Sequence, residues 1–119
     1  MAVRRDVEFI NFRPNLLVKD VAISIAFYRD VVGFEVRNST DDGSFALLGK
    51  GLAEVALVQT DDPPAEQAYL YVRGVEALSR RCKEAGCDIA RDLVDHPWGL
   101  RDFVVRDPDG HLIGIGERV

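Results

Sequence analysis

Apolar and polar positions repeat along this chain in a pattern that occurs twice. Residues 16–38, LLVKDVAISIAFYRDVVGFEVRN, resemble residues 70–92, LYVRGVEALSRRCKEAGCDIARD. Each stretch has an extended segment, an amphipathic run of helical length, a glycine and a second extended segment. The offset is 54 residues at the start and 53 at the glycine, which indicates a duplicated structural unit.

The amphipathic runs predict helices over about 21–32 and 75–85. Asp20 and Gly74 stand at the N-cap positions, and Gly33 and Gly86 stand where a left-handed C-terminal cap belongs. The spacing places one apolar stripe on each helix. These stripes consist of Val21, Ile25, Tyr28 and Val32, and of Val75, Leu78, Cys82 and Ala85.

Three short extended segments follow each helix. They cover about 34–38, 43–48 and 52–59 in the first half, and 87–94, 101–106 and 111–117 in the second. Turn sequences such as DDG, GKG, HPWG and DPDG separate them. The chain therefore predicts one α+β domain of two tandem βαβββ modules: module one at about 7–59, a linker at 60–66 and module two at about 67–118.

Alternation along the strands predicts two different faces. In the first strand the apolar side holds Ile10, Phe12, Pro14, Leu16 and Val18. The other side carries a mixture of polar, aromatic and small residues, which suits a ligand cavity better than a fully solvated surface. We expect this face to include Glu54 and Ala56 from module one, and Tyr69, Tyr71, Phe103, Val105 and Gly114 from module two.

Composition and charge exclude several classes of function. The net charge of −5 with scattered basic residues argues against a nucleic-acid partner, and no apolar run is long enough to cross a membrane. The N-terminal residues lack the pattern of an export signal, so we expect a cytoplasmic location. In that setting Cys82 and Cys87 are expected to be reduced, with Cys82 in the core.

Two groups of residues resemble a known family. They are VKDVAISIAFYRDVVGFEV, which contains Asp20, Ser24, Phe27, Tyr28, Gly33 and Phe34, and WGLRDFVVRDPDGHLIGIGE near the C-terminus. On a duplicated βαβββ pattern these resemble the glyoxalase, bleomycin-resistance and extradiol-dioxygenase superfamily, also called the vicinal oxygen chelate superfamily. The resemblance implies sheets that curl around a cavity, and a homodimer.

The resemblance also implies four metal-ligand positions in those members that are enzymes, where His or Gln, Glu, His and Glu are typical. Here they carry Arg13, Ala56, Gln67 and Gly114. Arginine has no lone pair to donate, and alanine and glycine offer no side-chain ligand. We therefore predict that no metal and no other cofactor is bound. Glu54 would be a metal ligand only if the strand register were shifted by two residues.

The two histidines are expected to differ. Asp107, Pro108, Asp109 and Gly110 have turn chemistry, so we interpret DPDGH as a turn before the last strand and not as a metal site. His96 lies beside Trp98 in a loop and is a candidate polar group at the cavity mouth. Neither histidine shows an acidic partner in the sequence, no nucleophile and base pair is visible, and we name no catalytic residue.

These observations favour a metal-free protein of the bleomycin-resistance type that sequesters an antibiotic or metabolite. Two alternatives remain: a divalent-metal lyase, isomerase or dioxygenase with an unusual ligand set, and a partner subunit with a degenerate cavity. Arg13 and Glu54 are expected either to pair with each other or to hold charged groups of the ligand. The candidate ligand-binding residues are Arg13, Glu54, Gln67, Tyr69, Tyr71, His96, Trp98, Phe103 and Gly114.

Overall fold

Each half of the chain forms a four-stranded sheet with one helical segment packed on it. A computed structural model describes residues 6–119, so the first five residues, which bear on the export-signal expectation, lie outside the described part. The first sheet has the order β1 (Asn15–Val18), β4 (Ala53–Gln59), β3 (Phe45–Lys50) and β2 (Glu35–Ser39). The second has the order β5 (Gln67–Tyr71), β8 (Leu112–Arg118), β7 (Leu100–Arg106) and β6 (Asp88–His96).

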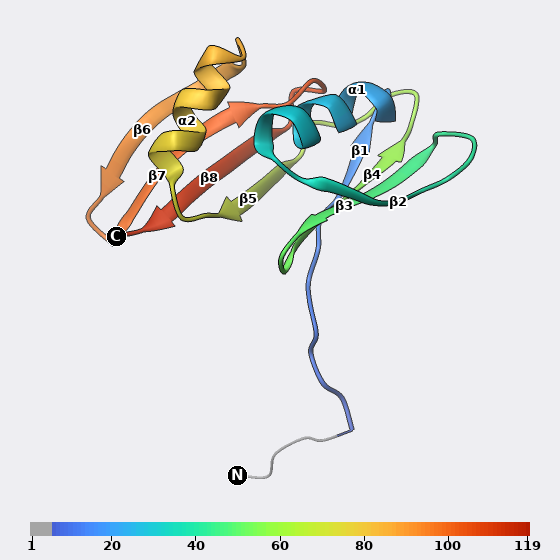
Figure 1. Cartoon of the computed structure of the whole chain (residues 1–119), viewed down its shortest axis with the longest axis horizontal. Helices are drawn as coiled ribbons and strands as arrows, with labels where there is room; N and C mark the ends of the chain where they lie inside the picture. Colours follow the sequence, from blue (N-terminus) through green and yellow to red (C-terminus); the bar gives the residue numbers. More distant parts are fainter. Residues whose placement is uncertain (1–5) are drawn as a thin grey trace.

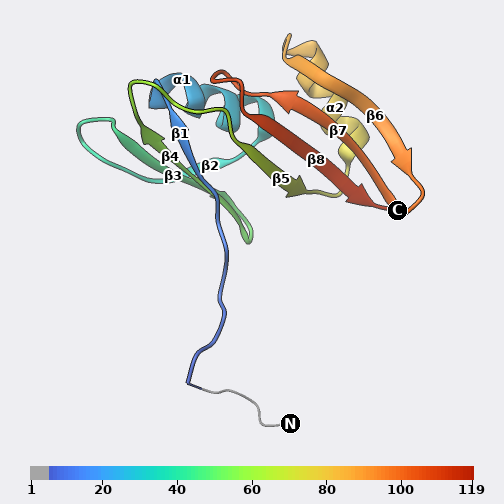
Figure 2. The ribbon, with the colours of Figure 1, turned by 180° about the vertical axis from the view of Figure 1, so that it is seen from behind.

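The two sheets have the same topology, which confirms the predicted duplication. The first strand of each half pairs parallel with the last, β1 with β4 and β5 with β8, and the other neighbours are antiparallel. Figure 1 shows the two sheets side by side, with β1 and β5 toward the middle of the molecule. Figure 2 shows the same sheets from behind, with α2 (Val75–Glu84) on their far side.

The first helix begins as predicted but widens along its length. The Asp20 carboxylate accepts a hydrogen bond from the backbone N–H of Ile23, and Gly33 has the expected left-handed conformation at φ 111°. Helix α1 (Val21–Ile25) continues as the π-helix η1 (Ala26–Val32). A π-helical turn holds more residues than an α-helical one. Phe27 is therefore buried together with Tyr28, whereas the predicted α-helical stripe included Tyr28 but not Phe27.

Helix α2 ends in a Schellman motif. The N–H of Gly86, at φ 76°, bonds to the carbonyl of Lys83, and the N–H of Cys87 bonds to that of Cys82. At the start of the helix the cap comes from another strand, because the Glu117 carboxylate of β8 accepts from the N–H groups of Gly74 and Val75. These backbone bonds lower the pKa of Glu117.

The core lies between the helices and the sheet faces that they cover. Leu16, Val18, Val55, Leu57, Ile113 and Ile115 are buried there. None of the helices within residues 6–119 is long and apolar enough to span a bilayer. We call the sheet faces opposite the helices the open face; it includes Tyr69, Asp102 and Gly114.

The predicted orientation of β7 is wrong by one residue. Phe103 pairs with Ile115 and Val105 with Ile113, and paired residues of neighbouring strands point to the same side of the sheet. Both side chains are therefore fully buried in the core and not on the open face. Asp102, which pairs with Gly116, stands on the open face instead.

The predicted first strand is also shorter than expected. Only residues 15–18 pair as β1, and residues 7–14 form an extended segment, here called the arm, that runs away from the body (Figure 1). The arm is tied to β4 at its base, where the carbonyl of Pro14 accepts from the N–H of Ala56 and the Asn11 amide donates to Glu54. Phe9 and Phe12 on the arm are 96% and 97% exposed.

Candidate functional site

Asp102 is the centre of a polar cluster on the open face of the second sheet. Its Oδ1 atom lies 2.7 Å from Nη2 of Arg91 and 2.7 Å from Nε2 of His96, and its Oδ2 accepts from the Tyr69 hydroxyl at 2.8 Å. A carboxylate only accepts hydrogen bonds, so His96 carries a proton on Nε2. The expectation that His96 has no acidic partner is therefore wrong.

The cluster shifts the acidity of two of its members. Burial acts to raise the pKa of Asp102, but the hydrogen bonds from Arg91, Tyr69 and His96 outweigh it and lower that pKa. Burial, together with the bond to Asp102, raises the pKa of Tyr69 to about 12. Asp102 is thus an ionised acceptor and Tyr69 a neutral donor at neutral pH.

The Tyr69 ring lies over two glycines of β8. A Cβ atom placed on Gly114 would meet Cδ1 of Tyr69 at 2.4 Å, and one placed on Gly116 would meet the Tyr69 hydroxyl oxygen. The space that the missing side chains leave is thus filled by the ring of Tyr69. The glycines are required so that this ring can lie flat and reach Asp102.

Exposed aromatic rings surround this cluster. Trp98, 70% exposed, stacks on His96 with ring centroids 4.4 Å apart. Tyr71 contacts Tyr69 edge-on at 4.9 Å, and the guanidinium of Arg118 lies 4.7 Å from the centre of the Tyr71 ring. Aromatic surface with a few fixed polar groups is typical of small-molecule sites. We call the four residues Tyr69, Tyr71, His96 and Trp98 the aromatic platform.

A mostly apolar cleft of about 310 Å³ lies between the two halves of the chain, beside the platform. Three of the predicted residues, Glu54, Tyr69 and Tyr71, line it. Core residues of both halves form its floor and arm residues form part of its rim. The remaining lining residues are Phe12, Pro14, Leu16, Tyr28, Val32, Phe34, Leu52, Ala53, Val55, Ala68, Leu70 and Ile113.

The predicted pair of Arg13 and Glu54 is replaced by another. Glu54 accepts from Nη1 of Arg37 at 3.1 Å and from the Asn11 amide at 2.8 Å, whereas Arg13 is exposed on the arm. The Arg37 guanidinium lies flat on Gly49, where a Cβ atom would meet it at 2.4 Å. Glu54 is thus already paired within the first sheet.

The positions that hold a metal in the family's enzymes do not fit one here. Arg13 is a cation, Ala56 is a buried methyl group, and Gly114 is covered by the Tyr69 ring. Only Gln67, exposed on β5, has a side-chain oxygen. A divalent ion needs several converging oxygen or nitrogen ligands, and these four residues do not supply them.

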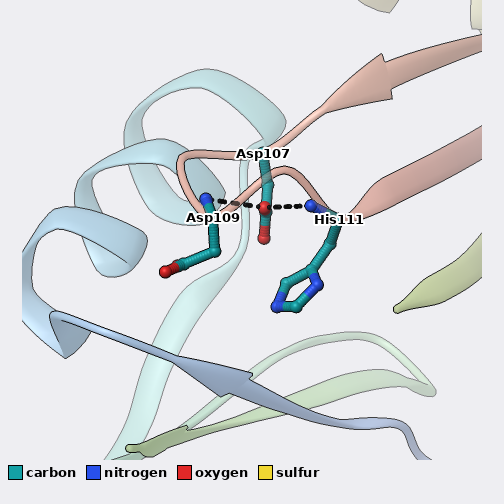
Figure 3. Close-up of side chains that lie close together, drawn as sticks. All are labelled: Asp107, Asp109 and His111. Atoms are coloured by element: carbon teal, nitrogen blue, oxygen red, sulfur yellow. Dashed lines mark hydrogen bonds between the residues drawn. The ribbon is translucent and has the colours of Figure 1, made fainter. Parts of the chain in front are cut away.

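Asp107, Asp109 and His111 each place one potential ligand atom within 4.8 Å of the others, and they form the one such group found in residues 6–119 (Figure 3). Their ligand atoms are already engaged. Asp107 Oδ1 accepts from the N–H groups of Asp109 and His111, and its Oδ2 accepts from the Tyr28 hydroxyl. The structure therefore confirms the predicted turn at Asp107–Gly110.

The other two members of that group hold the halves of the molecule together. Asp109 accepts from the N–H of Lys19 at 2.9 Å and from the Ser24 hydroxyl at 3.3 Å. The buried His111 accepts at Nδ1 from the N–H of Glu66, so its Nε2 carries the proton and donates to the carbonyl of Leu17. Their geometry assigns these residues a structural role.

Sequence reasoning missed Asp102 and Arg91. The sequence signal for Asp102 was the strict alternation in RDFVVR. Phe103 and Val105 share one side of the strand, so Asp102 must point to the other side. Arg91 could not be placed in the same way, because β6 has irregular register on both sides of it.

Comparison with known proteins agrees with this fold. The family model for the glyoxalase/bleomycin resistance protein/dioxygenase superfamily matches residues 11–115. A bleomycin resistance protein of Geobacillus stearothermophilus is 28% identical, over 89% of this chain and 95% of that protein. An uncharacterized protein of Mycobacterium tuberculosis (strain ATCC 25618 / H37Rv) is 29% identical, over 89% of this chain and 73% of that protein.

Among solved structures, TioX from Micromonospora sp. ML1 superimposes with a TM-score of 0.81 and is 26% identical, over 92% of this chain and 98% of TioX. The family match spans both modules and includes the helix that begins at Asp20 and the turn at Asp107. The chain belongs to the glyoxalase/bleomycin resistance protein/dioxygenase superfamily.

Proposed function

We propose that this protein binds a planar aromatic small molecule on the aromatic platform without a metal, and sequesters it as the name of its bleomycin-resistance relatives suggests. The ligand is an antibiotic or a metabolite. The proposal includes a homodimer in the cytoplasm, where binding alone removes the ligand from its target. The acidic net charge of −5 favours a neutral or cationic ligand over an anionic one.

The observation that carries the proposal is the position of Tyr69. Its ring occupies the space over Gly114, and it leaves aromatic surface exposed beside Trp98 and Tyr71. A ring held by the bond to Asp102 loses little further freedom when a flat ligand stacks on it, and that favours binding. The same ring stands where a metal ligand would be needed for chemistry.

Trp98 allows a direct test because it is the one tryptophan of the chain. Its emission should be quenched saturably by metal-free bleomycin or by a planar cationic probe such as an acridine, each titrated with and without EDTA. Tyr69→Ala should weaken binding about tenfold or more, since stacking of an aromatic face contributes about 1–3 kcal/mol. Ile23→Ala, on the helical side, is the matched control and should bind as the wild type does.

Two outcomes would contradict the proposal. If neither probe quenches Trp98 or raises the melting temperature, the site does not take planar aromatic compounds. If binding requires added Mn²⁺, Zn²⁺ or Fe²⁺ in stoichiometric amount and Gln67→Ala abolishes it, the metal-dependent alternative is correct. Metal analysis of protein purified without chelator separates these cases.

A further inference from the structure

Cys82 and Cys87 are the two cysteines of the chain, and they occupy paired positions of one backbone motif. The Schellman motif at the end of α2 closes with a 3.0 Å hydrogen bond from the N–H of Cys87 to the carbonyl of Cys82. Gly86, which is left-handed at φ 76°, reverses the chain between them. Side chains at these two positions of the motif commonly contact each other. The motif therefore turns the two thiols toward one another.

The surroundings of the two thiols agree with that contact. Cys82 is fully buried in the core, and Cys87 packs against the same apolar cluster. The two side chains are free thiols that form a hydrogen bond with each other. A disulfide joins Cα atoms roughly 4.4–6.8 Å apart, and a direct backbone hydrogen bond holds two residues at about that separation. Cys82 and Cys87 thus meet the geometric requirement for a disulfide.

Access to solvent differs between the two thiols. Cys82 is fully enclosed, whereas Cys87 is partly exposed in the turn between α2 and β6 (Figure 1). A dissolved oxidant therefore reaches Cys87 first, and Cys82 lies behind it as the second sulfur. An exposed thiol beside a second, resolving thiol is a common arrangement in reversibly oxidised cysteines. A purely apolar contact at these positions needs neither a reactive side chain nor its exposure.

We propose that Cys82 and Cys87 are an oxidative modification site, where a hydroperoxide converts the two thiols into an intrachain disulfide. In the first step the sulfur of Cys87 attacks one oxygen of hydrogen peroxide, the O–O bond breaks, and water leaves. Cys87 is then a sulfenic acid. In the second step the sulfur of Cys82 attacks the sulfur of Cys87, the S–O bond breaks, and a second water leaves. Two thiols and one peroxide thus give one disulfide and two waters, with the sulfurs oxidised and the peroxide reduced.

The protonation of the thiols controls the rate of this reaction. Burial raises the pKa of both thiols, that of Cys82 to about 11, whereas the hydrogen bond from Cys82 acts to lower the pKa of Cys87. The thiolate is the attacking species, so the reaction should be slow at neutral pH and faster in base. The site therefore responds to sustained exposure to peroxide, and small thiols return it to the reduced form.

The disulfide would link the last turn of α2 to the segment that enters β6. Arg81, which precedes Cys82, donates hydrogen bonds to the carbonyls of Val31 and Val32 at the end of η1. A cross-link here fixes the helix end that carries this contact between the two halves. Because it removes freedom from the unfolded chain, the cross-link should also stabilise the folded protein. This inference is independent of the ligand and the dimer in the proposed function.

The first experiment maps the bond in the full-length wild type. Reduced protein is treated with hydrogen peroxide, denatured in N-ethylmaleimide and digested with trypsin, which cleaves after Lys83 between the two cysteines. Mass spectrometry should recover the two peptides joined through Cys82 and Cys87, unlabelled and lacking two hydrogen atoms. A non-reducing gel should show no cross-link between chains, and dithiothreitol should restore both thiols. Raising the pH above neutral should speed up the reaction.

Two variants test the order of the steps. In Cys82→Ala, dimedone should trap Cys87 as a sulfenic acid, because its resolving partner is missing. In Cys87→Ala, the buried Cys82 should stay reduced over the time in which the wild type is fully oxidised. Equal oxidation of Cys82 in that variant overturns the assigned order. The mapping experiment uses the wild type, so it decides the disulfide even where Cys82→Ala lowers the stability.

Buffers of reduced and oxidised glutathione measure whether the fold favours the bond. The equilibrium constant for disulfide formation should be at least about tenfold larger in the native protein than in urea, since a well-placed disulfide and the fold stabilise each other. An equal or smaller constant in the native protein overturns the proposal, because the fold then holds the thiols apart. Peroxide treatment that yields only unreacted thiols, cross-linked chains, or sulfinic and sulfonic acids at Cys87 overturns it as well.

Discussion

The hydroxyl of Tyr28 donates a 2.7 Å hydrogen bond to Oδ2 of Asp107, and the two residues are 79 positions apart in the sequence. Tyr28 belongs to η1 of the first half and Asp107 to the turn before β8 of the second, and both are buried. Burial, and then the neighbouring Asp107 carboxylate, raises the pKa of Tyr28, so the phenol remains a donor over the whole working pH range. The bond thus joins the two halves inside the core.

Tyr28→Phe should lower the free energy of unfolding by about 1–3 kcal/mol, because it leaves a buried carboxylate oxygen without its donor. Urea unfolding followed by circular dichroism measures this loss. Tyr71→Phe removes a hydroxyl from an exposed ring and should cost much less. A Tyr28→Phe variant as stable as the Tyr71→Phe control would contradict the structural role of the bond.

Divalent metal should not stabilise the group Asp107, Asp109 and His111. Each ligand atom of the group already has a hydrogen-bonding partner in the fold, and a bound ion would displace several of these bonds. The melting temperature should therefore stay within about 1 °C when Zn²⁺, Mn²⁺ or EDTA is added, since only an ion that binds the native state raises it. A saturable rise that disappears in Asp109→Asn would show that the site does bind metal.

Gly114→Ala should destabilise the protein by about 1–3 kcal/mol, because the new methyl group must push aside the Tyr69 ring and weaken its bond to Asp102. In a Tyr69→Ala background the same substitution should cost little. The four proteins of this double-mutant cycle, compared by urea unfolding, give the coupling between the two positions. A coupling energy near zero would mean that the ring does not depend on Gly114.

Asp102 should make stability depend on pH in the acid range. The pKa of Asp102 is lowered in the folded protein. Its contribution to the free energy of unfolding is therefore fully present above the ordinary pKa of 3.8 and is lost as the pH falls through the lower pKa of the folded state. The stability difference between wild type and Asp102→Asn should therefore be constant above about pH 5 and shrink toward pH 3. Asp61→Asn, an exposed change in the linker, controls for the loss of one negative charge. A difference that grows with acidity would contradict the assigned direction.

The duplication, the helix caps and most strand faces could be predicted because they follow from local rules. Asp20 caps its helix as its side-chain chemistry requires, and Ala68 and Leu70 point inward where alternation places them. The prediction failed where local rules compete. The π-helical turn brought Phe27 into the core. In β7, Phe103 was predicted on the open face, but it pairs with Ile115, whose side chain points into the core.

The candidate site was predictable as a set of residues more than as an arrangement. Tyr69, Tyr71, His96 and Trp98 do lie together on the open face. Asp102, which organises them, was missed because the alternation in RDFVVR was assigned to the wrong face of the sheet. Arg13 was expected at the cavity because the first strand was expected to extend through it. In the structure the pairing of β1 begins only at Asn15, so Arg13 lies on the arm instead.

The hydrogen bond from the N–H of Lys19 to Asp109 and the bond from His111 to the carbonyl of Leu17 also affect folding during synthesis. The ribosome makes these backbone groups of the first half first, and Asp109 and His111 follow them by 90 and 94 residues. Until then the N–H of Lys19 and the carbonyl of Leu17 lack their native partners. The nascent first half is therefore expected to remain incompletely folded, and exposed to chaperones, until the C-terminal strand emerges.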